Sequence, residues 1–137
     1  TLAGTNYGLW LAASFGSSVV VVFGYPDNEF AQPKNVLFGH LLCAFIGIIF
    51  ITLFKISQDR TIFFLTIGIA VGISVMLMMY FKITHPPAGG NAVLVMLTQD
   101  SFQFLLFPIT VGAITIIIGG IIYNRLILNK KYPLKWL

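Results

Sequence analysis

The sequence predicts an all-α membrane protein: a small transmembrane helix bundle with two discontinuous, half-helix segments and an internal repeat. Hydrophobic residues make up 58% of the 137-residue chain and charged residues only 9%, whereas about 25% of a soluble domain is charged. The charges also lie between long apolar stretches instead of alternating with them. Because such a chain cannot cover a water-exposed surface, a soluble globular domain is excluded.

Three stretches are long enough to cross a bilayer, which requires roughly 20 mostly apolar helical residues. They are Val36–Phe54, Thr61–Phe81 and a stretch from Leu105 or Pro108 to Leu128. Glycines within these spans often lie four or eight residues apart, which favours close packing between helices. These glycines are Gly39, Gly47, Gly68, Gly72, Gly112, Gly119 and Gly120.

Two further apolar segments are too short or too interrupted to be ordinary spans. The segment Ala88–Leu97 lies between two prolines and a polar stretch, and as a helix it extends only about 15 Å. The segment Tyr7–Phe23 has nearly the length of a span, but Ser14–Ser18 interrupts its middle, so we expect a broken helix there. Non-helical backbone at membrane depth must be covered by protein or water, so both segments are expected to face the middle of the bundle.

The chain matches itself at a shift of 73 residues, which predicts two repeat units at 7–54 and 61–128. The shift places Gly16 on Gly89, Val20 on Val93, Asp27 on Asp100, Gly39 on Gly112 and Gly47 on Gly120. Unit two opens with the span Thr61–Phe81, and unit one has no such span, so we expect one helix to precede Thr1. Residues 1–137 are expected to form a single transmembrane domain. Because glycine is common in this chain, chance is the alternative to a repeat.

The positive charges predict the orientation of the chain but not the path of the second short segment. If Ala88–Leu97 dips into the membrane and returns, Lys34 and Lys82 lie opposite the other six cations. If it crosses, Lys34 and Lys82 join the four C-terminal cations, opposite Lys55 and Arg60. The split is six to two in both arrangements, so the positive-inside rule places the basic tail, residues 129–137, in the cytoplasm. Only the length of the segment favours the dip.

The stretch His85–Ala92 combines several features that favour an anion site. Pro86 and Pro87 end the incoming helix, and Pro87 suits the first position of a new one. The first N–H groups of that helix lack intrahelical partners and lie at the positive end of its dipole, where anions bind. These groups belong to Gly89, Gly90 and Asn91.

The first short segment offers similar donors, and the two histidines lie near both segments. Its donors and its glycine are Ser14, Gly16, Ser17 and Ser18. Neither segment carries a carboxylate, which disfavours a cation site. His85 is either a switchable positive charge that suits proton-coupled anion movement or a partner of the carbonyls freed at the proline break. His40 is interpreted as a structural residue within a span, and Asn35 as the cap of the span that follows it; both are candidates to support the anion site.

Other classes of site find no support in the sequence. No zinc spacing, phosphate-binding loop, nucleophile elbow or carboxylate pair occurs, and the chain has four acidic residues in all, so we expect no enzyme, no metal and no cofactor. The net charge of +4 needs no nucleic-acid partner, because basic and aromatic residues at the C-terminus suit lipid headgroups. Cys43 has no second cysteine to pair with and is predicted to be a packed core thiol. No signal peptide is visible at the start of the chain.

Several stretches resemble the HPP family of integral membrane proteins. His85–Gly90 resembles the signature that names the family, and Ser14–Ser18 and Ala31–Val36, followed by Gly39-His40, resemble its other marked stretch. Tyr123-Asn124 and Lys131–Pro133 resemble its C-terminal end. The resemblance covers nearly the whole chain and implies four or five transmembrane helices, found in bacteria, cyanobacteria and plastids and sometimes fused to nucleotide-binding CBS domains, which these residues do not include. Some members are similar to nitrite transporters of the plastid envelope and the cyanobacterial membrane.

These observations lead to two hypotheses of different classes. The first is a small-anion transporter or channel, with nitrite the leading anion, in the inner membrane of a bacterium. Its partners would be the lipid bilayer, the anion, and a homo-oligomer or a larger membrane complex. The second is an accessory subunit of a larger membrane complex that transports nothing and uses the short segments only for packing.

Overall fold

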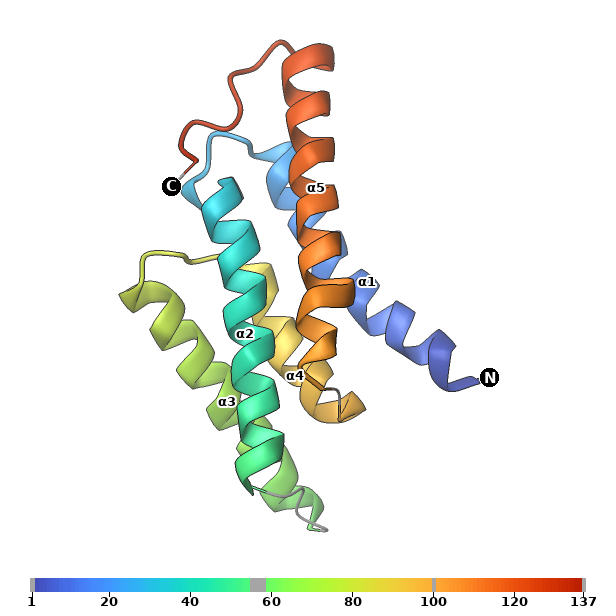
Figure 1. Ribbon diagram of the computed structural model, residues 1–137. Coiled ribbons are helices and arrows are strands. Elements are labelled where there is room, and N and C mark those ends of the chain that lie inside the picture. The colour runs from blue at the N-terminus through green and yellow to red at the C-terminus, as the bar shows by residue number, and fades with distance from the viewer. Residues whose placement is uncertain (1, 55–58, 100, 137) are drawn as a thin grey trace.

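The computed structural model describes residues 2–54, 59–99 and 101–136, with side chains from residue 13 onward except that of residue 54. These residues form a helical bundle, shown in Figure 1. The α-helices are α1 Leu2–Gly24, α2 Pro33–Phe54, α3 Arg60–Tyr80, α4 Gly89–Thr98 and α5 Val111–Ile122. Short 3₁₀ turns, Glu29–Ala31 and Pro86–Ala88, precede α2 and α4, and the segments Leu105–Thr110 and Tyr123–Ile127 flank α5. The first of these segments is kinked at Phe107, whose backbone angles, φ −140° and ψ 122°, are not helical.

The three predicted spans are confirmed. Helical stretches long and apolar enough to cross a membrane run over Pro33–Leu53, Arg60–Tyr80 and Leu105–Ile127. The outermost of them, α3, exposes apolar side chains along its length; Ile62, Leu65 and Met79 are each more than half exposed. A contiguous apolar surface of this kind is stable against lipid and not against water, so the protein is an integral membrane protein that crosses the bilayer several times.

Local signals explain where α3 begins and ends. The side chain of Asp59 accepts hydrogen bonds from the backbone N–H groups of Thr61 and Ile62, at 2.7 and 3.1 Å, and so caps the helix. At the other end Lys82 has a positive φ of 55°, and the N–H of Ile83 donates to the carbonyl of Met78 at 2.9 Å. This is the usual way to satisfy the last carbonyls of a helix, although a glycine is the more common residue at the left-handed position.

The expected break at Ser14–Ser18 is wrong, because α1 continues through it from Leu2 to Gly24. The Ser17 hydroxyl donates to the carbonyl of Ala13 at 3.1 Å, and the Ser18 hydroxyl oxygen lies 3.1 Å from the carbonyl oxygen of Ser14. Serine side chains can therefore bond to the preceding turn without ending a helix. The sequence suggested an interruption where an intact helix buries Ser14 and Ser18 and exposes Ser17.

The predicted cap at Asn35 is also wrong. Helix α2 begins two residues earlier, at Pro33, because a proline fits the first helical position, where its missing N–H costs nothing. Asn35 instead lies inside the first turn, and its Nδ2 donates to the backbone carbonyl of Thr84 at 3.0 Å. Its role is to tie the start of α2 to the segment between α3 and α4.

The C-terminal tail folds back onto the start of α2. The Tyr132 hydroxyl donates to the carbonyl of Ala31 at 2.7 Å, and Gln32 Oε1 accepts from the N–H groups of Leu134 and Lys135 at 2.8 and 3.2 Å. Tyr132 is fully buried, and burial raises the pKa of its phenol above the ordinary value, so its hydroxyl stays a donor.

The position of the tail also decides the path of α4. Lys34, Lys82 and Lys135 line one hollow, so the tail lies at the same end of the bundle as the starts of α2 and α4. Helix α4 runs beside α2 and in the same direction, and α5 returns to that end (Figure 1). This is the crossing arrangement, with Arg60 at the opposite end, and not the dip that segment length favoured.

Glycines allow the closest approaches between helices. A Cβ added at Gly39 would lie 2.8 Å from the Cβ of His85, and one added at Gly47 would lie 3.0 Å from the carbonyl oxygen of Ala92. Added atoms at Gly112 and Gly120 would overlap side chains of α1, and one added at Gly119 would lie 3.2 Å from the Phe23 ring on that helix. The packing role predicted for Gly68 and Gly72 is wrong, since nothing lies within 4 Å of an added Cβ there.

The predicted packed thiol is confirmed. Cys43 is fully buried, and its Sγ lies 3.7 Å from the Sδ of Met78 on α3. It packs in an apolar cluster that joins α2, the end of α3 and the start of α4.

Candidate functional site

Five polar side chains are buried together where α1, α2 and the start of α4 meet. Ser18, His40, His85 and Asn91 have no exposed surface, and Ser14 is 7% exposed. Buried polar groups in a membrane protein are costly and usually mark a functional site. We refer to these five residues as the polar cluster.

Local structure brings each member to this place. Ser14 and Ser18 are four residues apart on α1 and so share one face of that helix. His40 lies in the third turn of α2, and Asn91 in the first turn of α4. His85 is the residue before the two prolines; it has extended backbone angles, φ −138° and ψ 93°, as expected for a residue that precedes proline.

Short hydrogen bonds connect the cluster in one chain. The Ser18 hydroxyl lies 2.8 Å from Nε2 of His40 and 2.8 Å from Nε2 of His85. Nδ1 of His85 is 2.8 Å from the carbonyl oxygen of Phe30. At the other end, Nδ2 of Asn91 is 2.8 Å from Nδ1 of His40 and 3.3 Å from the His40 carbonyl oxygen.

Two further contacts pack neighbouring residues against the cluster. The Ser14 hydroxyl donates to the carbonyl of Pro87 at 2.9 Å, which fixes the proline turn against α1. The ring of Phe15 meets the His40 ring edge-on, with centroids 4.9 Å apart. Asn91 Oδ1 is buried and has no hydrogen-bond partner. A buried acceptor without a partner is unusual and leaves one place in the cluster where a donor is missing.

The structure brings together only part of the predicted site. Ser14, Ser18, His85 and Asn91 meet, and His40, expected only to support the site, lies at its centre. Ser17 and Gly16 are exposed; the Ser17 hydroxyl donates to its own helix and nothing approaches Gly16. Pro86 and Gly90 are exposed as well, whereas Pro87 and Gly89 are half-buried.

The backbone amides of the proline turn are not free in this structure. The N–H of Ala88 donates to the carbonyl of His85 at 2.9 Å, and that of Gly89 donates to the carbonyl of Pro86. Because Pro86 and Pro87 have no N–H, the 3₁₀ turn begins without the donors that an anion would need. Of the three amides predicted to bind an anion, that of Gly89 is therefore already bonded within the turn, and the side chains of the polar cluster offer further donors.

A polar hollow of about 170 Å³ lies at the end of the bundle that holds the tail. Its lining residues are Glu29, Gln32, Lys34, Asn35, Lys82 and Lys135. Asn35 joins the hollow to the segment before His85, since its Nδ2 donates to the carbonyl of Thr84. Sequence reasoning missed this hollow, because its three lysines are far apart in the chain and only the fold brings them together.

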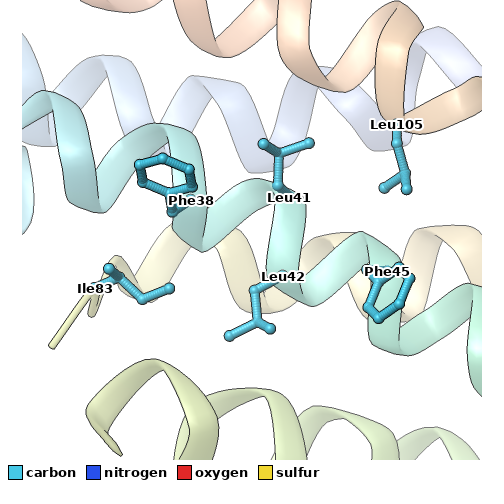
Figure 2. Close-up of a pocket in the computed structure, with 6 residues that line it drawn as sticks. All are labelled: Phe38, Leu41, Leu42, Phe45, Ile83 and Leu105. Atoms are coloured by element: carbon cyan, nitrogen blue, oxygen red, sulfur yellow. The ribbon is translucent and has the colours of Figure 1, made fainter. Parts of the chain in front are cut away.

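A second hollow, of about 320 Å³, is apolar (Figure 2). Four of its side chains come from α2, and Ile83 and Leu105 complete the lining. Figure 2 shows carbon-only side chains around it, so it offers no group that binds an anion. Among the residues that the structure describes, no three His, Cys, Asp or Glu side chains come together as metal ligands.

Comparison with known proteins identifies the family. The family described as HPP, transmembrane region, matches residues 2–133 of this chain. The chain belongs to the HPP family. Two curated relatives of this HPP protein are transmembrane proteins of Dictyostelium discoideum.

The two relatives cover nearly all of the chain. One is 32% identical over 131 residues, which are 92% of this chain and 45% of that protein. The other is 28% identical over 132 residues, which are 93% of this chain and 42% of that protein. The chain therefore spans less than half the length of these relatives. No solved structure gives a significant match.

Proposed function

We propose that this HPP protein moves a small inorganic anion across the membrane, with nitrite the first anion to test. In this proposal the anion passes through the polar cluster, between two halves of the molecule that are related as an inverted repeat. The observation that carries the proposal is the correspondence between helix contacts in the two halves.

Contacts between helices correspond at the 73-residue shift found in the sequence. Gly39 on α2 lies against Ala88, with 3.5 Å between an added Cβ and that of Ala88. Shifting both residues between the halves gives Gly112 on α5 and Phe15 on α1, and these two residues are also in contact. The pair Gly39 and Ala88 joins α2 to the start of α4, and the shifted pair joins α5 to α1.

A second pair of contacts follows the same rule. Gly47 on α2 approaches Val95 on α4, with 3.1 Å between an added Cβ and that of Val95. The shifted pair is Gly120 on α5 and Val22 on α1, which also touch. Two matches of this kind support the proposed repeat.

The directions of the helices are those that an inverted repeat would have. Helices α1 and α5 run in one direction, whereas α2 and α4 run in the other (Figure 1). The units α1–α2 and α4–α5 would then be related by a two-fold axis in the plane of the membrane. Inverted repeats of this kind are typical of secondary transporters, which bind substrates at the interface between repeats near the middle of the bilayer.

In this proposal the polar cluster lies at the interface between the two repeats. The hydrogen bond between Ser14 and Pro87 joins two residues that are 73 apart, so the shift maps this contact onto itself and places it on the axis. Ser18 and Asn91 are also 73 apart, and both bond to the His40 ring. A substrate site near the axis would therefore include the members of the cluster.

The chemistry of the cluster suits an anion better than a cation. Its hydroxyl, imidazole and amide groups can donate hydrogen bonds, and it contains no carboxylate. An anion would replace the bonds that now join Ser18 to the two imidazoles. The three lysines around the polar hollow would raise the local concentration of anions at that end of the bundle.

The proposal is tested by nitrite uptake into proteoliposomes that contain the purified full chain. A double variant, His85→Ala with Asn91→Ala, is expected to lose uptake, whereas the matched surface variant Ser17→Ala keeps it. Size-exclusion chromatography and circular dichroism of each variant show whether the bundle is intact. Unchanged uptake in the folded double variant would refute the placement of the site.

A separate variant tests the role of the hollow. Lys82→Gly removes one positive charge at a position whose φ of 55° suits glycine, so the helix end should remain intact. We expect slower uptake at low ionic strength and a smaller difference from the wild type as salt is added, because salt screens such charges. No flux of any small anion, together with isolation in a fixed ratio with partner proteins, would instead favour the accessory-subunit hypothesis.

A further inference from the structure

The ends of the polar cluster determine where its hydrogens lie. Nδ1 of His85 faces the backbone carbonyl of Phe30, which can only accept a hydrogen bond, so this nitrogen carries a hydrogen. At the other end, Nδ2 of Asn91 lies between Nδ1 and the carbonyl oxygen of His40. Because the carbonyl requires a donor there, the amide nitrogen is correctly placed and His40 Nδ1 accepts.

With both ends assigned, every bond between them has one direction. His40 accepts at Nδ1, so as a neutral ring it carries its hydrogen on Nε2 and donates to the Ser18 oxygen. His85 carries its hydrogen on Nδ1, so its Nε2 accepts the hydroxyl hydrogen of Ser18. The chain of donors therefore runs from Asn91 through His40, Ser18 and His85 to the carbonyl of Phe30.

Ser18 has a second acceptor for its hydrogen. The carbonyl oxygen of Ser14 lies 3.1 Å from the Ser18 hydroxyl, and the hydroxyl can rotate without movement of any heavy atom. If it turns to Ser14, the Ser18 oxygen can accept from both imidazoles at 2.8 Å. Nε2 of His85 can then bind a proton and donate it in a hydrogen bond to the Ser18 oxygen.

We propose that the polar cluster binds one proton, at Nε2 of His85, and that the anion of the proposed function moves together with this proton. On binding, the proton forms the N–H bond at His85 Nε2, and the Ser18 hydrogen turns from that nitrogen to the Ser14 carbonyl. The cluster gains one positive charge, and every hydrogen bond among its members is kept. The charge then lies where the incoming anion needs one.

The groups that face His85 limit the site to one proton. The facing groups are the Ser18 hydroxyl from α1, the Phe30 carbonyl from the Glu29–Ala31 turn, His40 and Gly39 from α2, and Ala88 before α4. His40 is the titratable one, and the two ring centroids are 5.0 Å apart. In the part of the chain that the structure describes, no carboxylate or ammonium bonds to either ring. Two positive charges this close and without exposed surface would repel strongly, so a second proton is excluded.

His40 is the poorer acceptor of the two rings. Its Nδ1 faces the NH₂ group of Asn91, and a proton on that nitrogen would leave two donors facing each other. The amide would have to turn over, which would bring Asn91 Oδ1 against the His40 carbonyl. His85 needs only the rotation of one hydroxyl.

Solid-state NMR of the ¹⁵N-histidine-labelled full chain in lipid vesicles, without any anion substrate, tests the proton site. At alkaline pH we expect His85 to carry its hydrogen on Nδ1 and His40 on Nε2. On acidification one ring per chain should become doubly protonated, and it should be that of His85. Ser17→Ala should show the same titration, whereas Ser18→Ala should require a lower pH to protonate His85.

Three results would overturn the proposal. The first is protonation of His40 before His85, the second is simultaneous protonation of both rings, and the third is no protonation of either ring while the bundle remains folded. Since the measurement contains no anion, it stands whether or not nitrite is carried. Uptake driven by an imposed pH gradient tests the coupling, and uptake that ignores the gradient would refute it while leaving the proposed transport intact.

Discussion

Replacement of Ser18 by alanine tests whether the polar cluster holds the bundle together. The Ser18 hydroxyl connects α1 to His40 on α2 and to His85 before α4, each at 2.8 Å. Both imidazoles are fully buried, so no water replaces the lost partner. Ser18→Ala therefore leaves a donor on one ring and an acceptor on the other without partners.

The expected loss follows from these two groups. Measured hydrogen bonds between transmembrane helices average about 0.6 kcal/mol, so two ordinary ones would cost about 1.2 kcal/mol. A buried group that is left unsatisfied costs about 1–3 kcal/mol, and here both partners remain behind without access to water. We therefore expect Ser18→Ala to lower the free energy of unfolding by about 2–6 kcal/mol.

Ser17→Ala is the matched control on the same helix. Its hydroxyl is exposed and bonds only to the carbonyl of Ala13, and alanine is the better helix former. We expect this variant to be as stable as the wild type or a few tenths of a kcal/mol more stable. Reversible unfolding in mild detergent, or steric trapping in lipid bicelles, measures both variants. If the two differ by less than about 0.5 kcal/mol, the cluster contributes no more than an average surface position, and the reasoning is wrong.

Two further predictions concern packing and the tail. Gly39→Ala places a methyl 2.8 Å from the Cβ of His85, so we expect it to destabilise the bundle by about 1–3 kcal/mol and to reduce uptake. Gly72→Ala, which has open space around the added methyl, is the control. Equal loss of stability in the two variants, measured by unfolding, would refute the contact. Tyr132→Phe removes the bond to Ala31 at a cost of about 1 kcal/mol, so limited proteolysis should cut the tail faster than in the wild type, whereas an unchanged cutting rate would argue against docking of the tail.

The apolar character of the chain is sufficient to predict where it crosses the membrane. The requirement for about 20 apolar residues acts on each segment separately, so Arg60–Tyr80 and the two other spans follow from local composition. The effect of proline is equally local. Pro86 and Pro87 therefore predict the start of the short helix α4, whose observed range is Gly89–Thr98.

The errors of prediction arise where the tertiary structure supplies partners. Ser14–Ser18 suggested a broken helix because polar side chains are costly among apolar ones, but α1 stays intact since His40, His85 and the Pro87 carbonyl satisfy the two inward-facing hydroxyls. Asn35 suggested a helix cap, yet its partner is Thr84, 49 residues away. Neither partner can be inferred from neighbouring residues.

The sequence by itself determined that this protein is embedded in a membrane, how many long spans it has, and which serines and histidines are candidates for a buried polar site. Only the tertiary structure decided that Ser18 joins both histidines, that Ser17 does not take part, and that three lysines meet at one end. The physical reason is the distance along the chain over which each interaction acts. Hydrophobic length and proline geometry act within a segment, whereas a buried hydrogen bond depends on which helices pack together.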